Sequence, residues 1–273
     1  MVKMKMNKKG IYFTIAFSFL MMVVLALAIL IFNDQLKSEE IVTKLSLVDR
    51  VYDLDSSLQQ SMADIFHIKS NISINMSNTS IMFTEKIPNS GRSNFNNSMI
   101  SFKKFVESNI SNINITIDDV IARLPLIIMP YNITFESDGQ TGINVIPREL
   151  NFMGYSISIL LSENVTSCNN NIQAGTFNLS VYVYGQNENK CEYSLLIDAT
   201  AENEISVNGN ELIIDVTNNR LSISLNNETS MTAYTKTSLL LDTSNIYIRY
   251  PSPSISIHFD DMGVYKVSGV RII

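Results

Sequence analysis

Side chains that could do acid–base or metal chemistry are few in this 273-residue chain, and they are dispersed. Two pairs of adjacent acids, Asp118-Asp119 and Asp260-Asp261, offer carboxylates of the kind used in general acid–base catalysis or metal binding. Neighbouring side chains on a strand point to opposite faces, so we expect these carboxylates to be solvated charges. The two histidines, His67 and His258, are far apart in the sequence.

Sequence motifs of familiar enzyme classes are missing as well. The chain has no Gly-x-Ser-x-Gly motif, no His-Glu-x-x-His motif and no glycine-rich phosphate-binding loop. His258 alternates with Ile257 and Phe259, which favours an exposed histidine on the opposite face of a strand. We therefore predict that the protein is not an enzyme and holds no metal or cofactor. The alternative is an exported enzyme of unrecognised type, which a cleft that gathers Asp260, Asp261, His258 and another ligand would favour.

The chain has two cysteines, Cys168 and Cys191, and they flank a segment predicted to form a strand. An even pair of cysteines in an exported domain favours a disulfide bond. This bond would close a 24-residue loop, and the chain-entropy model assigns it roughly 3 kcal/mol of stability. Two free buried thiols are the alternative.

N-glycosylation is the modification that the sequence indicates. Its acceptor, Asn-x-Ser/Thr, has to lie in an exported and accessible part of the chain. Ten such acceptors are present, all after the hydrophobic segment described next, and composition alone predicts about half as many. They are Asn71, Asn75, Asn78, Asn96, Asn109, Asn114, Asn132, Asn164, Asn178 and Asn227. We expect a subset of them to carry glycan.

An uncharged apolar segment at residues 11–32 comes before all of these groups. Its 22 residues can span a hydrocarbon core of ~30 Å as a helix, at a rise of ~1.5 Å per residue. Four lysines precede the segment and acidic residues follow it, beginning with Asp34. This asymmetry predicts a cell-membrane protein with a cytoplasmic N-terminus and an extracellular region of residues 33–273. That region carries 16 basic and 26 acidic side chains, a formal charge of −10, which disfavours nucleic acid as a partner.

Two kinds of processing are compatible with this segment. Ala26-Leu27-Ala28 has the A-x-A pattern of a removed signal peptide, although residues 29–32 stay apolar where such a signal turns polar. The second pattern is Lys8-Lys9-Gly10, which stands directly before the apolar segment. In this respect the chain resembles archaeal type IV pilin-like proteins with a class III signal.

In that family, a prepilin peptidase cuts after a short basic leader that ends in glycine, and the apolar helix is kept. The resemblance implies cleavage between Gly10 and Ile11 on the cytoplasmic side of the membrane, and it extends over about 30 residues. Bacterial type IV pilins carry Glu five residues after the cut, where this chain has Ile15. Archaeal relatives often lack this Glu.

Residues 33–68 have the spacing of an amphipathic helix, with Ile41, Leu45, Val48 and Tyr52 three or four residues apart. No Gly or Pro occurs between residues 11 and 87, so we expect the membrane helix to continue through this segment. In pilin-like proteins such a helix packs its outer half on a β domain. An ordinary amphipathic helix on the domain core and a short coiled-coil stalk are alternatives.

Two segments of different composition follow. Residues 69–130 are rich in Asn and Ser, and short helices are predicted at 98–110 and 117–124. Residues 131–273 are dominated by predicted strands and tight turns, among them a hairpin at Asn208-Gly209 and later strands at 237–241, 245–250, 254–259 and 264–272. Strands at this spacing are typical of an antiparallel sandwich. The predicted fold class is therefore α+β: a long N-terminal transmembrane and amphipathic helix, then an extracytoplasmic antiparallel β-sandwich.

The resulting division of the chain is a basic leader at 1–10, a membrane helix at 11–32, a stalk at 33–68, the Asn/Ser-rich segment at 69–130 and the sandwich at 131–273. We expect a membrane-anchored, pilin-like structural protein of the cell surface, either a minor pilin or an adhesion subunit. Its partners would be the membrane, other pilin-like subunits and a prepilin peptidase. The alternative is a non-assembling, signal-anchored ectodomain that acts as a binding module or as an accessory subunit of an envelope complex.

Overall fold

The computed structural model divides the chain into two compact units, residues 1–53 and 54–273. It describes residues 8–77, 79–110, 112–117, 124–148, 152–187, 189–226, 229–239, 247–259 and 263–272.

The described part of the first unit is entirely helical. Helix α1 extends from Lys8 to Lys69, so that its last residues belong to the second unit. The helix therefore passes through both the apolar and the amphipathic segments of the sequence, as the lack of Gly and Pro after Ile11 predicts. It ends at Lys69, one residue beyond the predicted stalk at 33–68. One helix within the described residues is long and apolar enough to cross a membrane, and it is this one.

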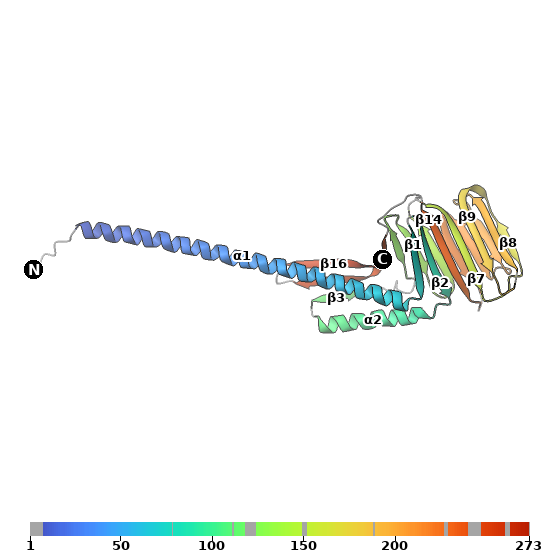
Figure 1. Cartoon of the computed structure of the whole chain (residues 1–273), viewed down its shortest axis with the longest axis horizontal. Coiled ribbons are helices and arrows are strands. Elements are labelled where there is room, and N and C mark those ends of the chain that lie inside the picture. The colour runs from blue at the N-terminus through green and yellow to red at the C-terminus, as the bar shows by residue number, and fades with distance from the viewer. Residues whose placement is uncertain are drawn as a thin grey trace, which may run out of the picture. The chain divides into compact units, whose positions relative to one another are not determined.

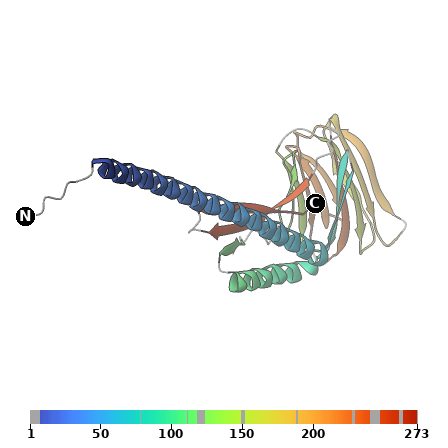
Figure 2. The ribbon, with the colours of Figure 1, turned by 60° about the vertical axis from the view of Figure 1, so that its left-hand side comes forward.

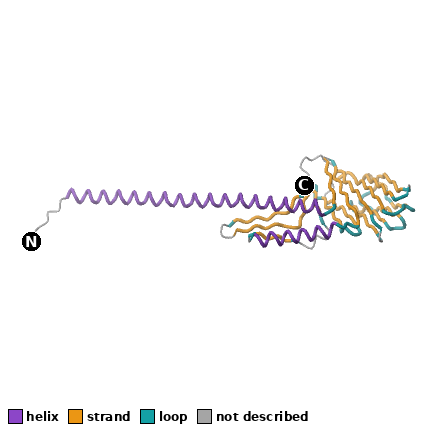
Figure 3. Tube along the Cα trace, turned by 60° about the horizontal axis from the view of Figure 1, so that its bottom comes forward, coloured by secondary structure: helices purple, strands orange, loops and turns teal. Residues whose placement is uncertain are grey.

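The second unit consists mainly of strands, which form two sheets (Figure 3). The first sheet has six strands in the order β1-β2-β14-β7-β9-β10, several of which are labelled in Figure 1. Their bounds are Ile72–Ser77 for β1, Ser80–Ile87 for β2, Met231–Leu239 for β14, Phe152–Leu161 for β7, Ala174–Tyr184 for β9 and Lys190–Ile197 for β10. All neighbours are antiparallel except β7 and β9, which pair in parallel with Ile157 opposite Val181.

The second sheet has ten strands, nine of them in the order β16-β15-β4-β5-β6-β13-β12-β11-β8, with β3 also pairing with β15. Their bounds are Val264–Arg271 for β16, Tyr247–Phe259 for β15, Ile113–Thr116 for β3, Leu126–Met129 for β4, Ile133–Ser137 for β5, Gly142–Pro147 for β6, Arg220–Leu225 for β13, Leu212–Thr217 for β12, Asn203–Val207 for β11 and Cys168–Asn171 for β8. Every pairing in this sheet is antiparallel.

The core lies between the two sheets, which face each other in Figure 2. Phe83 of β2 stacks on Phe135 of β5 with a ring-centroid distance of 4.0 Å, and both side chains are fully buried. Residues alternate between buried and partly exposed along strands such as β12 and β13, because successive side chains of a strand point to opposite faces. The domain is therefore a sandwich, and the predicted α+β class is confirmed with one parallel pairing added.

Asparagine and glycine residues in left-handed conformations close several hairpins. Asn208 and Gly209 have φ angles of 54° and 65° between β11 and β12, as the hairpin dipeptide predicts. Asn218 and Asn219, at 51° and 63°, turn β12 into β13. Asn adopts this conformation more readily than other residues with a Cβ atom.

The observed strands differ from the sequence prediction in several places. The sheets already include β1, β2, β3 and β4, which precede the segment where strands were expected to dominate. β14 begins at Met231, although the sequence placed a strand only from residue 237. β15 continues through Pro251 and Pro253, and its pairing with β16 shifts between Tyr250 and Ser254, because proline has no N–H to donate to the ladder. Within the predicted helix 117–124, residues 118–123 lie outside the described residues.

A helical layer accompanies the sheets within the second unit. Helix α2, Gly91–Asn109, covers the short helix predicted at residues 98–110 and begins earlier. Phe66 of α1 and Phe95 of α2 pack edge to face with centroids 5.9 Å apart. Lys266 of β16 forms a 2.7 Å ion pair with Asp55 of α1, and the Ser268 hydroxyl bonds to the same carboxylate. The end of α1 is thus fastened both to α2 and to the final strand.

Candidate functional site

The apolar part of α1 exposes large side chains to its surroundings. Phe19, Leu25 and Leu30 are 71%, 65% and 64% exposed, and every residue from Phe17 to Phe32 belongs to the exposed class. A helix that is apolar all round is typical of a membrane span. The bond between Gly10 and Ile11 lies in the first turns of this helix.

Cys168 and Cys191 form a disulfide bond with their Cα atoms 6.0 Å apart, which confirms the predicted bond. Cys168 begins β8, the edge strand of the second sheet, and Cys191 lies in β10, the edge strand of the first sheet. The bond therefore joins the two sheets at one open side of the sandwich. Two free thiols, the alternative, are ruled out in this structure.

The ten glycan acceptors differ in how their asparagines are placed. Those with exposed side chains are Asn71, Asn75, Asn109, Asn114, Asn164 and Asn178. Asn96 and Asn132 are half-buried, and the Oδ1 atom of Asn96 is buried without a hydrogen-bond partner among the described residues. Asn78 and Asn227 lie outside the described residues. Attachment of a glycan needs an accessible amide nitrogen, so the six exposed positions are the strongest acceptors.

The residues considered for catalysis do not gather in the described part of the chain. His258 is exposed while Ile257 is fully buried, as the strand alternation predicts, and its ring lies 4.3 Å from that of Tyr265. The His67 Nε2 atom lies 3.1 Å from the carbonyl oxygen of Ile272. The acid pairs at 118–119 and 260–261 lie outside the described residues. No group of three or more metal-binding side chains occurs among the residues that are described.

Buried charge is concentrated in a structural network. The guanidinium of Arg92 lies 3.3 Å from the Glu85 carboxylate and donates to the carbonyl of Ser137 at 2.8 Å. Asn89 donates to Glu85 and to the carbonyl of Ser70, each at 2.8 Å. Arg92 and Glu85 are both nearly inaccessible to solvent. This network connects β2, α2, β5 and the end of α1.

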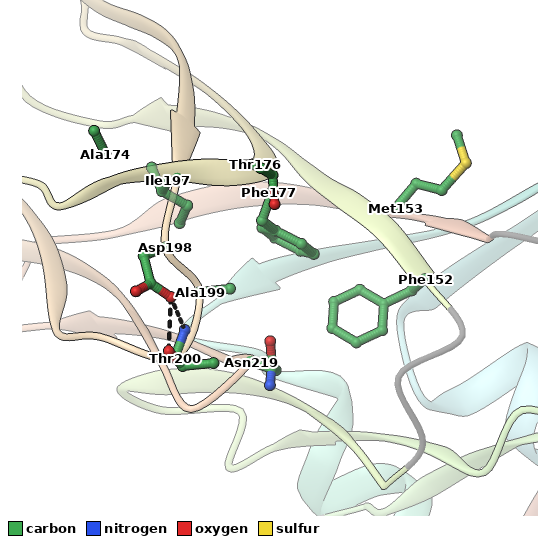
Figure 4. Close-up of a pocket in the computed structure, with 11 residues that line it drawn as sticks. Phe152, Met153, Ala174, Thr176, Phe177, Ile197, Asp198, Ala199, Thr200 and Asn219 are labelled. Carbon is green, nitrogen blue, oxygen red and sulfur yellow. Dashed lines mark hydrogen bonds between the residues drawn. The ribbon is translucent and has the colours of Figure 1, made fainter.

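Among the residues that the structure describes, a groove at one end of the sandwich is a candidate binding site of the second unit. It is open to solvent and has a volume of about 650 Å³, which is within the range of small-molecule sites. Phe152 and Phe177, from the starts of β7 and β9, form one side of it (Figure 4). Asp198 and Thr200, from the turn after β10, lie opposite, with Asn219 between the two sides. The groove therefore combines aromatic rings with a carboxylate, a hydroxyl and an amide.

The aromatic side of the groove is built on a buried tyrosine. The rings of Phe152 and Phe177 meet at a centroid distance of 5.1 Å and an angle of 78°, and Tyr155 packs against both. The Tyr155 hydroxyl donates to the Asn219 carbonyl at 2.8 Å. Burial raises the pKa of Tyr155 far above its ordinary value, so the hydroxyl remains a donor over the physiological pH range.

The polar side of the groove is fixed by a buried asparagine. Asn203, only 1% exposed, donates to the carbonyls of Asp198, Ala201 and Val216 at 2.8, 3.0 and 3.1 Å. Its Oδ1 atom accepts the backbone N–H of Gln173 at 2.9 Å. These bonds hold the turn that carries Asp198 against three neighbouring segments. The turn is thus positioned before any ligand arrives.

The charge on Asp198 is stabilised within its own turn. The Thr200 hydroxyl donates to Oδ1 of Asp198 at 2.7 Å, and the Thr200 backbone N–H donates to the same atom at 3.0 Å (Figure 4). These bonds hold the pKa of Asp198 below its usual value because they favour the ionised form. The groove therefore contains a carboxylate that is negative at neutral pH.

No protein-family model matches the chain, and neither a curated protein nor a solved structure matches it. Functional assignment therefore depends on the residues and geometry of the chain itself.

The groove was not predicted from the sequence. Its residues come from four segments far apart in the chain, which start near Phe152, Ala174, Ile197 and Asn219. One local signal exists: Asp198 and Thr200 form an Asp-x-Thr pattern, which is typical of a side-chain-capped turn. That pattern also occurs at Asp215 and Thr217, so it does not by itself mark a site.

Proposed function

We propose that this chain is a membrane-anchored structural protein of the cell surface, of the pilin-like type, acting as a minor pilin or an adhesion subunit. The observation that carries the proposal is the exposed apolar surface of α1 between Phe17 and Phe32. Transfer of such a surface from water into lipid is strongly favourable. The lysines before it and the acids after it favour a cytoplasmic N-terminus and an extracellular β domain.

Two further observations support export of the β domain. A disulfide bond persists in oxidising compartments and is rare in the cytosol, and Cys168 and Cys191 form one. Six glycan acceptors also present exposed asparagines, which is the accessibility that N-glycosylation outside the cytoplasm requires.

Assembly with other subunits is supported by apolar residues beyond the proposed membrane span. Ile41, Val42 and Leu45 are 58%, 62% and 60% exposed within the first unit. Ile41 and Leu45 are four residues apart and lie on the same face of the helix. A second helix packing on this face would bury them, in the way that apolar stripes drive helix association in water.

N-terminal and intact mass analysis of the protein from its own host membranes tests the processing step. A mature start at Ile11 with the apolar helix retained would support prepilin-type cleavage. A start at Met1 or Met6 would instead favour the signal-anchored ectodomain. A start near Ile29 would remove the anchor and contradict the proposal.

Substitution in α1 tests assembly separately from anchoring. In an Ile41→Ser/Leu45→Ser double variant, we expect the protein to remain in the membrane fraction but to lose crosslinking to other subunits. Thr43→Ala is a matched control, because position 43 lies on a different helical face. Unchanged crosslinking in the double variant would contradict helix-mediated assembly.

A second candidate function is a binding module displayed by a membrane anchor. The observation that favours it is the groove beside Asp198, which has a size and lining compatible with a small ligand. An uncut N-terminus together with a monomeric protein in detergent would favour this function over assembly.

A further inference from the structure

We propose that the groove defined by Phe152, Phe177, Asp198, Thr200 and Asn219 binds a neutral saccharide, through a pyranose ring with two adjacent hydroxyl groups. This inference does not depend on filament assembly, and either proposal can fail without the other. It is argued from the charge of the groove, the placement of its polar atoms and its aromatic side.

Charge excludes an anionic ligand. Among the described residues that line the groove, Asp198 is the one with an ionisable side chain, and no Lys, Arg or His accompanies it. An anion placed here would meet a carboxylate with no cation to compensate it, which costs free energy at short range. A wholly apolar ligand is also disfavoured, because it would remove water from the Asp198 carboxylate without replacing its hydrogen bonds.

The polar atoms of the groove can serve both halves of a diol. Oδ1 of Asp198 accepts both the hydroxyl and the N–H of Thr200, which leaves lone pairs of Oδ2 for a ligand. The side-chain amide of Asn219 likewise has no hydrogen-bond partner among the described residues, although its backbone is held at both ends. One sugar hydroxyl can donate to Oδ2 of Asp198, and the neighbouring one can accept from the Asn219 amide.

The combination of the Asp198 carboxylate with the Asn219 amide favours a saccharide over an organic cation as the ligand. An ammonium group would be attracted by the Asp198 carboxylate and by the aromatic rings. It carries only donors, however, so it would leave the N–H groups of Asn219 without an acceptor. A hydroxylated ligand satisfies both Asp198 and Asn219.

The aromatic side of the groove can contact the C–H face of a sugar ring. A pyranose has a patch of C–H groups on one face, and the faces of aromatic rings carry negative charge density that attracts such hydrogens. Phe177 is half-buried at the groove wall and offers the accessible ring, while Phe152, only 8% exposed, packs beside it and supports it (Figure 4). Contact with the Phe177 ring would orient the hydroxyl edge of the sugar toward Asp198 on the opposite side and toward Asn219 between the two sides.

The groove is also prepared for binding. The turn bearing Asp198 is held by Asn203, and the Asn219 N–H donates to the Ala199 carbonyl at 2.6 Å. Because these groups are already fixed, binding does not have to order them, which favours affinity. Asn203 is therefore a positioning residue for the site.

The test titrates methyl glycosides of glucose, galactose, mannose and N-acetylglucosamine, and separately tetramethylammonium, into the full chain in detergent, with saturation-transfer NMR as the readout. We expect saturation transfer from at least one glycoside. Asp198→Ser should weaken its binding tenfold or more, because a hydrogen bond to a charged acceptor is among the stronger ones. Serine is chosen because asparagine at this position would create the glycan acceptor Asn-Ala-Thr with Ala199 and Thr200.

Asp215→Ser is the matched control. Asp215 accepts the Thr217 hydroxyl at 2.7 Å, the same distance as in the pair of Asp198 and Thr200, but it does not line the groove. Asn219→Gly removes the amide while keeping the left-handed backbone, which glycine tolerates, and it should also weaken glycoside binding. Far-UV circular dichroism and the urea midpoint of each variant show whether it is folded.

The saccharide could be a glycan on the protein itself or a saccharide from elsewhere. Producing the protein in hosts with and without N-glycosylation distinguishes these two sources. If glycans on the protein itself fill the groove, glycoside binding appears in protein made without glycosylation and is absent from the glycosylated protein. If the groove takes saccharide from elsewhere, both forms bind. The proposal is overturned if no glycoside binds either form, if Asp215→Ser weakens binding as much as Asp198→Ser, or if only tetramethylammonium binds.

Discussion

Replacing Asn203 should destabilise the β domain more than the size of the side chain suggests. Its amide contacts three carbonyls and its Oδ1 atom accepts one N–H, in a site that is 1% exposed. The amide has two N–H groups to share among the three carbonyls, so the side chain makes the equivalent of three full hydrogen bonds. At about 1 kcal/mol for each, Asn203→Ala is expected to lower the free energy of unfolding by about 3 kcal/mol. The loss comes from the Gln173 N–H and from carbonyls that each lose a donor.

The substitution Asn203→Asp tests whether hydrogen bonding or packing accounts for the stability that Asn203 contributes. Aspartate has nearly the same shape as asparagine, but it directs a carboxylate oxygen at the carbonyls of Asp198, Ala201 and Val216 in place of the donating amide. A buried charge that faces three carbonyls and has the Gln173 N–H as its donor is costly. We therefore expect Asn203→Asp to be at least as destabilising as Asn203→Ala, whereas packing alone predicts that the isosteric change is the milder one.

The assay is urea denaturation of the full chain in detergent, followed by the strand band in far-UV circular dichroism. Asn226→Ala is the control, because Asn226 is exposed and its amide donates to the Asn210 carbonyl at 2.9 Å. We expect this control to cost less than about 1 kcal/mol. If Asn203→Asp were no more destabilising than Asn226→Ala, the account of the buried asparagine would be refuted.

Three other properties of the β domain can be measured in the same way. Replacing Cys168 and Cys191 together with serine should lower the free energy of unfolding by roughly 3 kcal/mol, and an unchanged urea midpoint would contradict this. Partial burial favours a neutral Asp138, but hydrogen bonds from Thr141, Gln140 and Gly142 outweigh it and lower its pKa below 3.8. The stability that the ionised Asp138 contributes should therefore be complete above about pH 4 and be lost as pH falls through the lowered pKa. Unfolding curves at about pH 3 to 7 measure this loss, and Asp138→Asn should not show it. Burial raises the pKa of Tyr155 above 10.0, so its hydroxyl should stay protonated in the folded protein at about pH 11. The folded wild type and Tyr155→Phe should then show equal tyrosinate absorbance at that pH. The stability linked to the Tyr155 hydroxyl proton is complete below about pH 10 and is lost at higher pH.

Local sequence signals predicted the helix and several hairpins of this fold. The apolar segment after Gly10 and the lack of later helix-breaking residues are sufficient to predict α1. The Asn208-Gly209 turn likewise follows from the conformational freedom of these two residues. Both features depend on neighbouring residues alone.

Features that depend on distant segments were not predictable in the same way. The parallel pairing of β7 with β9 is not marked by any local pattern. The strand predicted from residue 237 was right only in part, because β14 begins at Met231 and its first residues pair with the distant end of β7, with Met231 opposite Leu161. The groove forms where the ends of β7, β9 and β10 lie beside the turn before β13. The order of strands in the two sheets determines that these segments lie together.

The position of the disulfide has a consequence for proteolysis. Cys168 and Cys191 enclose β9 and the turn that follows it, in which Gln186 and Asn189 are exposed. A protease that cuts this turn would leave the two fragments covalently joined, since the break lies inside the closed loop. A single nick there would go unnoticed on a non-reducing gel and would release no piece of the domain, which would suit a protein displayed among extracellular proteases.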